Sequence, residues 1–248
     1  MTVLDLVLLA TAPAIGSFAA LAADRAETGR SAIAPRSRCD GCGRPIAPQD
    51  LVPILSFLWL GGRARCCGAR IPAHLPGLEL ASFAIAAWGL SATTAAPEAI
   101  RIATVGLGTA LVGLAWFDLR HFRLPDAATL PLLLGGLALS AAGLTGPMWS
   151  HAAGAAAGYA LIAGIDAAYR RIRGQTGLGL GDAKLLAAGG AWTGLAALPS
   201  ILLLGALAGI GTALLRGSRW REPLPFGPGL ALGIWLAWCH GPVLLMAP

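Results

Sequence analysis

The stretch IATVGLGTALVGLAWFDLR, residues 102–120, decides what kind of protein this is. No charged residue occurs between Arg101 and Asp118, and an apolar run of this length approaches the ~20 residues that an α-helix needs to cross a bilayer. The run ends on a carboxylate. A carboxylate at the edge of hydrocarbon is costly, and it is usually retained for an ion path, a proton relay or catalysis. Asp118 is therefore a candidate functional residue.

The rest of the chain has the same apolar character. Of its 248 residues 56% are hydrophobic and only 12% are charged, which is too apolar for an ordinary soluble domain. We therefore predict an all-α polytopic membrane protein with about eight transmembrane helices, a short sixth one being separated from the seventh at Pro199. The apolar stretches are residues 3–23, 76–95, 101–117, 127–145, 148–168, 183–197, 198–215 and 226–246. Small residues at 152–158 predict close helix packing.

The basic residues predict the orientation. If the N-terminus lies outside, every arginine except Arg101 lies in a cytoplasmic loop, where Lys and Arg accumulate, and the only lysine, Lys184, follows such a loop directly. These loops are residues 24–75, 118–126, 169–182 and 216–225. The net charge of +6 then reflects orientation and attraction to anionic membrane lipid, and no nucleic-acid partner is expected. The first stretch has no basic residue before it, so we interpret it as a retained anchor rather than a cleaved signal peptide.

The same topology brings a second aspartate to the face of the membrane that Asp118 reaches. Asp182 ends the glycine-rich run GLGLGD, residues 177–182, just before the sixth stretch. Two adjacent carboxylates cannot both ionise cheaply, so they share a proton and can activate water for peptide hydrolysis. Taken singly, Asp182 has an alternative interpretation as a helix N-cap, and Asp118 as a charge facing lipid headgroups. Together they predict an aspartic-type peptidase.

Four cysteines lie in the loop at 24–75. Cys39 and Cys42 form a Cys-x-x-Cys pair, whereas Cys66 and Cys67 are adjacent. Paired cysteines on glycine-containing turns are typical of a zinc ribbon, and a cytoplasmic location disfavours disulfides. We predict a small zinc-ribbon-like insertion with these four residues as candidate zinc ligands, the alternative being a degraded or partly liganded site.

Further short motifs run along nearly the whole chain. They are Gly16-Ser17-Phe18, Ser37-Arg38-Cys39-Asp40-Gly41-Cys42-Gly43, Asp50-Leu51-Val52-Pro53-Ile54-Leu55-Ser56, Leu78-Glu79-Leu80, Phe117-Asp118-Leu119, Leu124-Pro125-Asp126, Gly179-Leu180-Gly181-Asp182-Ala183-Lys184-Leu185-Leu186, Gly190-Ala191-Trp192 and Pro225-Phe226-Gly227-Pro228. In this order they resemble the type IV prepilin peptidases, the leader peptidases and N-methyltransferases of bacterial type IV pilus and type II secretion systems.

The resemblance implies that Asp118 and Asp182 are the catalytic aspartates. It implies cleavage at the cytoplasmic face of the bacterial inner membrane, after a glycine that precedes the hydrophobic helix of a prepilin or pseudopilin. The methyl donor for the new N-terminal amine is then S-adenosylmethionine, to which we assign no residues. The expected domains are a first transmembrane helix at 1–23, a methyltransferase-associated cysteine loop at 24–75 and a transmembrane peptidase domain at 76–248.

The second cysteine pair departs from the family's Cys-x-x-Cys pattern. Ala64 replaces the first cysteine, Cys67 matches the second, and Cys66 is displaced. The departure leaves a peptidase without methyltransferase activity as the alternative. A proton-coupled transporter would also retain intramembrane carboxylates, but both acids here are expected near one face rather than at the midplane.

Three other charged residues have plain structural interpretations. Glu79, which matches a glutamate common in the family, is either a favourable charge at a helix N-terminus or a residue of methyl transfer. Asp126 is expected to be the N-cap of the fourth helix rather than a third catalytic acid. Lys184 either stabilises charge near Asp182 or extends toward headgroups, and we leave it unassigned.

Overall fold

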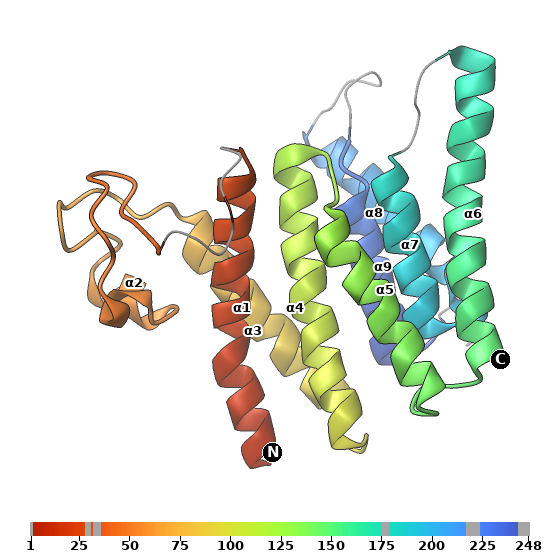
Figure 1. Ribbon diagram of the computed structural model, residues 1–248, viewed down its shortest axis with the longest axis horizontal. Helices are drawn as coiled ribbons and strands as arrows, with labels where there is room; N and C mark the ends of the chain where they lie inside the picture. The colour runs from red at the N-terminus through yellow and green to blue at the C-terminus, as the bar shows by residue number, and fades with distance from the viewer. Residues whose placement is uncertain (1, 28–30, 32–35, 175–178, 217–223, 243–248) are drawn as a thin grey trace. The chain divides into compact units, whose positions relative to one another are not determined.

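The computed structural model describes residues 2–27, 31, 36–174, 179–216 and 224–242. In these ranges the chain forms α-helices and two short 3-10 helices, without a strand, so the predicted all-α class is confirmed (Figure 1). Each of the eight apolar stretches contains most of one helix, although residues 243–246 of the last stretch lie outside the described ranges. The additional helix α2 (Leu55–Trp59) lies in the cysteine loop. The chain divides into two compact units, Met1–Gly113 and Leu114–Pro248.

Five of the described helices are long and apolar enough to cross a membrane: Val3–Arg25 within α1 (Val3–Glu27), α3 (His74–Ala92), α4 (Glu98–His121), α6 (Met148–Arg173), and Leu195–Leu214 around α8 (Leu198–Arg216). The helices α5 (Asp126–Ala141), α7 (Leu180–Thr193) and α9 (Gly227–His240) are shorter. The chain therefore has the helices of a membrane protein, while eight spans stay a prediction.

The first unit is built on α1 (Val3–Glu27), α3 (His74–Ala92) and the start of α4 (Glu98–His121). The helices α1 and α3 pack along each other, and a small core forms where Ala12 meets Ala86, Leu90 and Val105. Gly16 permits the close approach, because a Cβ there would lie 2.5 Å from the carbonyl oxygen of Leu78. Small side chains thus bring two apolar helices into contact, as is common in membranes.

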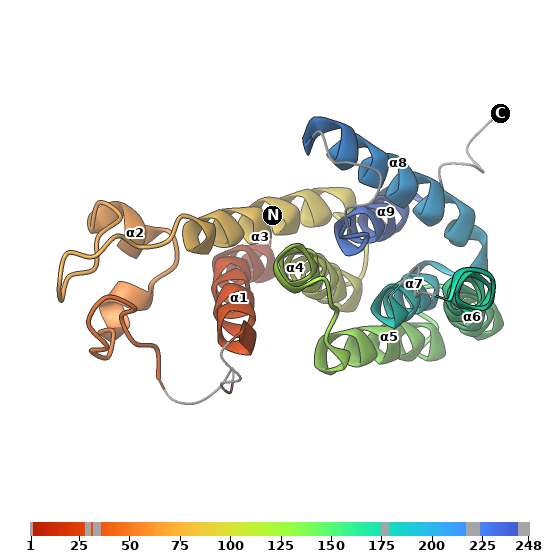
Figure 2. The same ribbon diagram turned by 90° about the horizontal axis from the view of Figure 1, so that it is seen from above.

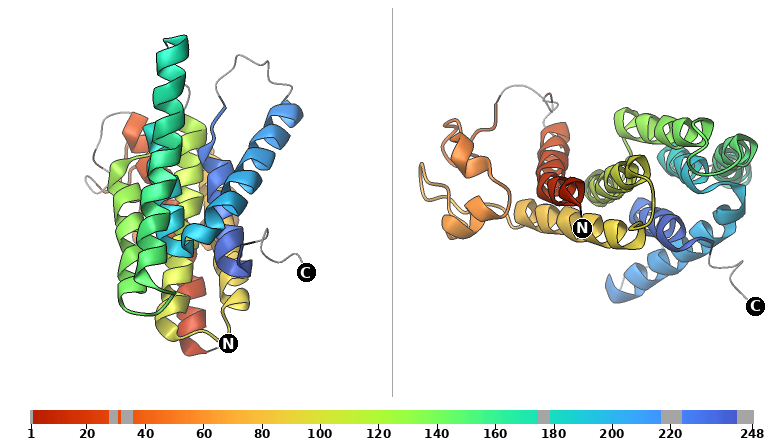
Figure 3. Two further views of the ribbon diagram at one scale, coloured as in Figure 1. Left: turned by 90° about the vertical axis from the view of Figure 1, so that its right-hand side faces the viewer. Right: turned by 90° about the horizontal axis from the view of Figure 1, so that it is seen from below.

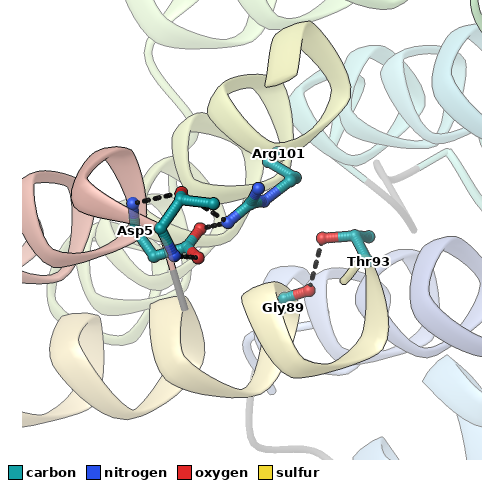
Figure 4. Close-up of polar contacts among 5 residues, drawn as sticks. Asp5, Gly89, Thr93 and Arg101 are labelled. Atoms are coloured by element: carbon teal, nitrogen blue, oxygen red, sulfur yellow. Dashed lines mark hydrogen bonds and ion pairs between the residues drawn. The ribbon is translucent and has the colours of Figure 1, made fainter. Parts of the chain in front are cut away.

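A buried ion pair ties the start of α1 to the start of α4. Arg101, the one arginine outside the predicted cytoplasmic loops, pairs with Asp5, and both side chains are less than a tenth exposed. Thr2 completes the cluster: its backbone N–H donates to Asp5 at 2.7 Å, and its hydroxyl accepts from Arg101 at 3.2 Å. Figure 4 shows the Asp5 and Arg101 side chains pointing toward each other. The only basic residue that departs from the predicted charge pattern therefore has its charge neutralised inside the protein.

The second unit is organised around α7, which contacts α5, α6 (Met148–Arg173) and α9 (Figure 2). Nearly all of its residues from Ala183 to Trp192 are buried, since the sequence AKLLAAGGAW offers small or apolar side chains on every face. The remaining helix, α8 (Leu198–Arg216), packs on α9 and is inclined relative to α6 (Figure 3).

Small residues set the contact between α6 and α7. A Cβ on Gly190 would lie 2.3 Å from the backbone of Gly154, and one on Gly158 would lie 2.8 Å from the carbonyl oxygen of Leu186. The close packing predicted for residues 152–158 is therefore confirmed.

The boundary near Pro199 differs slightly from the prediction. The helix α7 ends at Thr193, earlier than the predicted 197, because Gly194 adopts a φ of +80° that ends the helix. A 3-10 turn, η2 (Leu195–Ala197), follows, and α8 begins at Leu198, so Pro199 stands in the first helical turn, where its missing N–H does no harm.

Candidate active site and cysteine cluster

Asp118 lies in the last turn of α4 and is 5% exposed. The backbone N–H of Gly227 donates to its Oδ2 at 2.9 Å. Gly227 is the first residue of α9, and the first N–H groups of a helix have no partner within the helix. The beginning of α9 therefore supplies a fixed donor to a carboxylate that sits at the end of another helix.

The contact with α9 leaves no room for a side chain. A Cβ on Gly227 would lie 2.7 Å from Oδ2 of Asp118 and 3.0 Å from its Cγ. The glycine of the motif Pro225-Phe226-Gly227-Pro228 is therefore required by the close approach to Asp118. The sequence motif alone did not reveal this partnership.

Asp182 is half-buried in the first turn of α7. The N-cap of that helix is Gly179, so the interpretation of Asp182 as the N-cap is wrong: Asp182 is the third helical residue. Its carboxylate accepts a hydrogen bond from the backbone of Gly179, in the manner of an acidic residue that closes a capping box. The Asp182 and Asp118 carboxylates are close enough for their charges to interact. Their catalytic role stays a prediction.

The start of α7 is anchored to the residues that begin α5. A Cβ on Gly181 would lie 3.0 Å from the Cβ of Leu124, and Lys184 Nζ lies 2.5 Å from Oδ1 of Asp126. Pro125, not Asp126, is the N-cap of α5, so the N-cap prediction for Asp126 is wrong by one position. Lys184 is likewise not a solitary charge extended toward lipid headgroups, because it pairs with Asp126. This pairing holds the segment that carries Asp182.

A small apolar pocket of about 230 Å³ is lined in part by Leu119, the residue that follows Asp118 in the sequence. It lies between the end of α4, the second half of α8 and the start of α9. Its lining consists of Leu119, Ala208, Gly209, Thr212, Pro225, Pro228, Gly229 and Leu232. The pocket has the size of a side chain rather than of a helix, and its walls are small and apolar.

The four predicted metal ligands come together in the loop between α1 and α3. Among the described His, Cys, Asp and Glu side chains, Cys39, Cys42, Cys66 and Cys67 form the group whose ligand atoms all lie within 4.8 Å of one another. The loop also contains η1 (Pro48–Leu51), which a bidentate ion pair from Asp50 to Arg65 ties to the second cysteine turn, with contacts of 2.8 to 3.1 Å.

Hydrogen bonds distinguish the thiols of this cluster. Backbone hydrogen bonds from Cys42 and Gly41 lower the pKa of the Cys39 thiol to about 7. The neighbouring sulfur of Cys42 raises the pKa of the Cys66 thiol to about 12. Four converging sulfurs are the donor set that Zn²⁺ prefers in structural sites, so the residues present fit the predicted ion.

Glu79 has a role that neither sequence interpretation described. It is buried in the second turn of α3 and accepts the backbone N–H of Ile54 at 2.7 Å. Ile54 has a φ of +63°, which is uncommon for a β-branched residue. The Glu79 carboxylate therefore holds the turn that starts α2.

Comparison with known proteins identifies the family to which this chain belongs. Residues 11–92 match the family described as the bacterial peptidase A24 N-terminal domain, and residues 104–214 match the type IV leader peptidase family. A prepilin leader peptidase/N-methyltransferase of Aeromonas salmonicida is 42% identical over 213 residues, which cover 84% of this chain and 72% of that protein. The chain belongs to the type IV leader peptidase family. The resemblance seen in the sequence motifs is thereby confirmed.

Other relatives of this leader peptidase family member carry the same name. The prepilin leader peptidase/N-methyltransferase of Burkholderia pseudomallei is 42% identical over 203 residues, covering 80% of this chain and 65% of that protein. The one of Pseudomonas aeruginosa is 36% identical over 216 residues, covering 84% and 73%. No solved structure gives a significant match.

Proposed function

We propose that this member of the leader peptidase family is an aspartic-type endopeptidase that removes the leader of a prepilin or pseudopilin, with Asp118 and Asp182 as its catalytic pair. The observation that carries the proposal is the juxtaposition of these two carboxylates, whose charges interact within an apolar helical unit. The names of the relatives supply the substrate class.

In the proposed reaction the two carboxylates hold one proton between them. The ionised aspartate takes a proton from water, the resulting hydroxide adds to the scissile carbonyl, and the other aspartate protonates the departing nitrogen. The Gly227 N–H and the Gly179 backbone keep the carboxylates oriented.

The apolar pocket beside Leu119 supports a substrate with an apolar side chain next to the scissile bond. The apolar helix of a prepilin would then lie among the helices in the membrane, with its leader at the cytoplasmic face. That orientation, in the inner membrane, is part of the proposal and follows from the distribution of arginines.

Methyl transfer to the new N-terminal amine is proposed from the names of the relatives alone. The donor would be S-adenosylmethionine. The proposed domains are those expected from the sequence: an anchor at 1–23, a cysteine loop at 24–75 that serves methyl transfer and would be stabilised by Zn²⁺, and a peptidase domain at 76–248.

The test is the mass of a prepilin after incubation with the purified protein in lipid vesicles and S-adenosylmethionine. Asp118→Asn and Asp182→Asn should each abolish leader removal while the protein remains folded and inserted. Glu98→Gln is the matched control, because that carboxylate is exposed in the first turn of α4, at the opposite end of the helix from Asp118. Cleavage at the normal rate by either active-site variant would exclude the pair. Leader loss without a gain of one methyl group would leave a peptidase alone.

A further inference from the structure

Two turns of the cysteine loop share one backbone pattern. The first turn, residues 38–45, and the second, residues 63–70, are each closed by an antiparallel bridge between their end residues. Equivalent N–H groups donate to equivalent carbonyls: Cys39 to Arg44 and Gly43 to Cys39 in the first turn, and Ala64 to Ala69 and Gly68 to Ala64 in the second. The turns therefore correspond residue by residue.

Glycine and arginine repeat the correspondence. Gly43 and Gly68 stand at the same place in the two turns, with φ values of +70° and +73°. The side chain of Arg38 donates to the carbonyl of Gly43 at 3.1 Å, and that of Arg63 to the carbonyl of Gly68 at 3.4 Å. The second turn therefore has the same backbone as the regular Cys-x-x-Cys turn at residues 38–45.

The correspondence identifies the thiol that is out of place. Cys67 stands where the first turn has Cys42, but Ala64 stands where it has Cys39. Of the two positions that carry cysteine in the first turn, only one therefore carries cysteine in the second turn. Cys66 occupies the place that the first turn gives to Gly41.

The sulfur of Cys66 nevertheless reaches the cluster. It lies 3.3 Å from the sulfur of Cys42 and 4.0 Å from that of Cys67, while the sulfurs of Cys39 and Cys67 are 3.6 Å apart. Zn–S bonds of about 2.3 Å in a tetrahedron separate the sulfurs by roughly 3.8 Å. The observed separations bracket that value, so the four thiols can close on one ion with small side-chain movements.

The first turn explains why this position can supply a ligand. A Cβ built on Gly41 would lie 2.6 Å from the Cβ of Ala69, 3.2 Å from the sulfur of Cys67 and 3.8 Å from that of Cys39. This place in the first turn therefore borders two of the thiols, while Ala69 leaves no room there for a side chain. Cys66, at the same place in the second turn, points at the thiol of Cys42.

We propose that Cys66 supplies the fourth thiolate of a zinc site from the turn position that a regular knuckle gives to glycine, replacing the thiolate that Ala64 cannot provide. The site is then complete despite its irregular sequence. The ion would join the two turns and hold the loop between α1 and α3 in its fold. This inference concerns metal binding and is independent of whether the two aspartates cleave a substrate.

The experiment titrates the purified full-length, metal-free protein with Co²⁺ under reducing conditions. Thiolate-to-cobalt charge-transfer absorption reports the number of sulfur ligands. Cys66→Ser should lose about a quarter of that absorption, since one of four sulfurs is gone, and should bind Co²⁺ more weakly. Cys239→Ser is the matched control and should change neither quantity, because Cys239 lies in α9.

A rescue variant keeps the test decisive even if Cys66→Ser folds poorly. Ala64→Cys/Cys66→Gly gives the second turn the pattern of the first, and it should restore the full absorption. An unchanged spectrum in Cys66→Ser would overturn the proposal, as would a double variant that binds no better than Cys66→Ser. A disulfide between Cys42 and Cys66 that survives reduction, seen by mass spectrometry of the wild-type protein, would also overturn it.

Discussion

Gly227→Ala tests whether the position of the Asp118 carboxylate matters for cleavage. The new methyl group would lie 2.7 Å from Oδ2 of Asp118, where ordinary van der Waals contact needs about 3.4 Å. The contact is with the carboxylate of a buried side chain at a helix end, so either the carboxylate or the start of α9 must shift by about 0.7 Å. The hydrogen bond from the backbone of residue 227, 2.9 Å long in the wild type, would be distorted by the same movement.

A displacement of this size has a calculable consequence for the rate. Misplacing a catalytic group by about 1 Å costs on the order of 10²-fold in rate, so we expect kcat to fall by roughly 10- to 100-fold. This corresponds to about 1.4 to 2.7 kcal/mol of lost transition-state stabilisation. A change in KM would report a shift of the pocket proposed for the substrate, because Pro225, Pro228 and Gly229 beside residue 227 line it.

The assay is the initial rate of leader removal from a prepilin in lipid vesicles, with kcat and KM determined separately. Gly211→Ala is the matched control, since a Cβ at Gly211 meets nothing within 4 Å. A Gly227→Ala enzyme with a kcat within twofold of the wild type would refute the reasoning. An equal loss in Gly211→Ala would show a general sensitivity to substitution instead of a specific effect on Asp118.

Two further predictions concern stability, measured by unfolding in mixed micelles. Arg101→Met should lower the free energy of unfolding by about 3 to 5 kcal/mol, because it leaves the buried Asp5 carboxylate without its charged partner. The double variant Asp5→Leu/Arg101→Met should recover most of this loss. A double variant as unstable as Arg101→Met would contradict the prediction. Gly190→Ala should cost about 1 to 3 kcal/mol, because its Cβ would lie 2.3 Å from the backbone of Gly154. Gly164→Ala, which meets nothing within 4 Å, should be neutral or slightly stabilising, and equal losses in the two variants would argue against a specific α6–α7 contact.

Local patterns were sufficient for the helices and the family. A backbone in hydrocarbon must satisfy its own hydrogen bonds, so each long apolar stretch can be expected to form a helix, and each one does. The small residues at 152–158 also predicted their packing, since close approach of two helices needs glycine wherever the backbones touch. The family follows from motifs that are contiguous in the chain.

Capping residues were harder to predict. The sequence offers Asp126 and Asp182 as N-caps, whereas the N-caps in the structure are Pro125 and Gly179. A helix start depends on which N–H groups find partners as well as on residue type. The strained turn at Ile54 gave no signal in the sequence, since its partner Glu79 comes from the following helix.

The chain by itself determined the membrane-type helices, the candidate aspartates and the four cysteines, because hydropathy and residue chemistry are local properties. Tertiary structure alone decided that Gly227, far along the chain, holds Asp118, that Lys184 pairs with Asp126, and that the predicted ligand Cys66 reaches the other thiols from the turn position equivalent to Gly41. These contacts join residues that are distant in sequence or displaced from a regular pattern. They depend on how closely backbones approach each other, and that is settled only when the helices and turns pack.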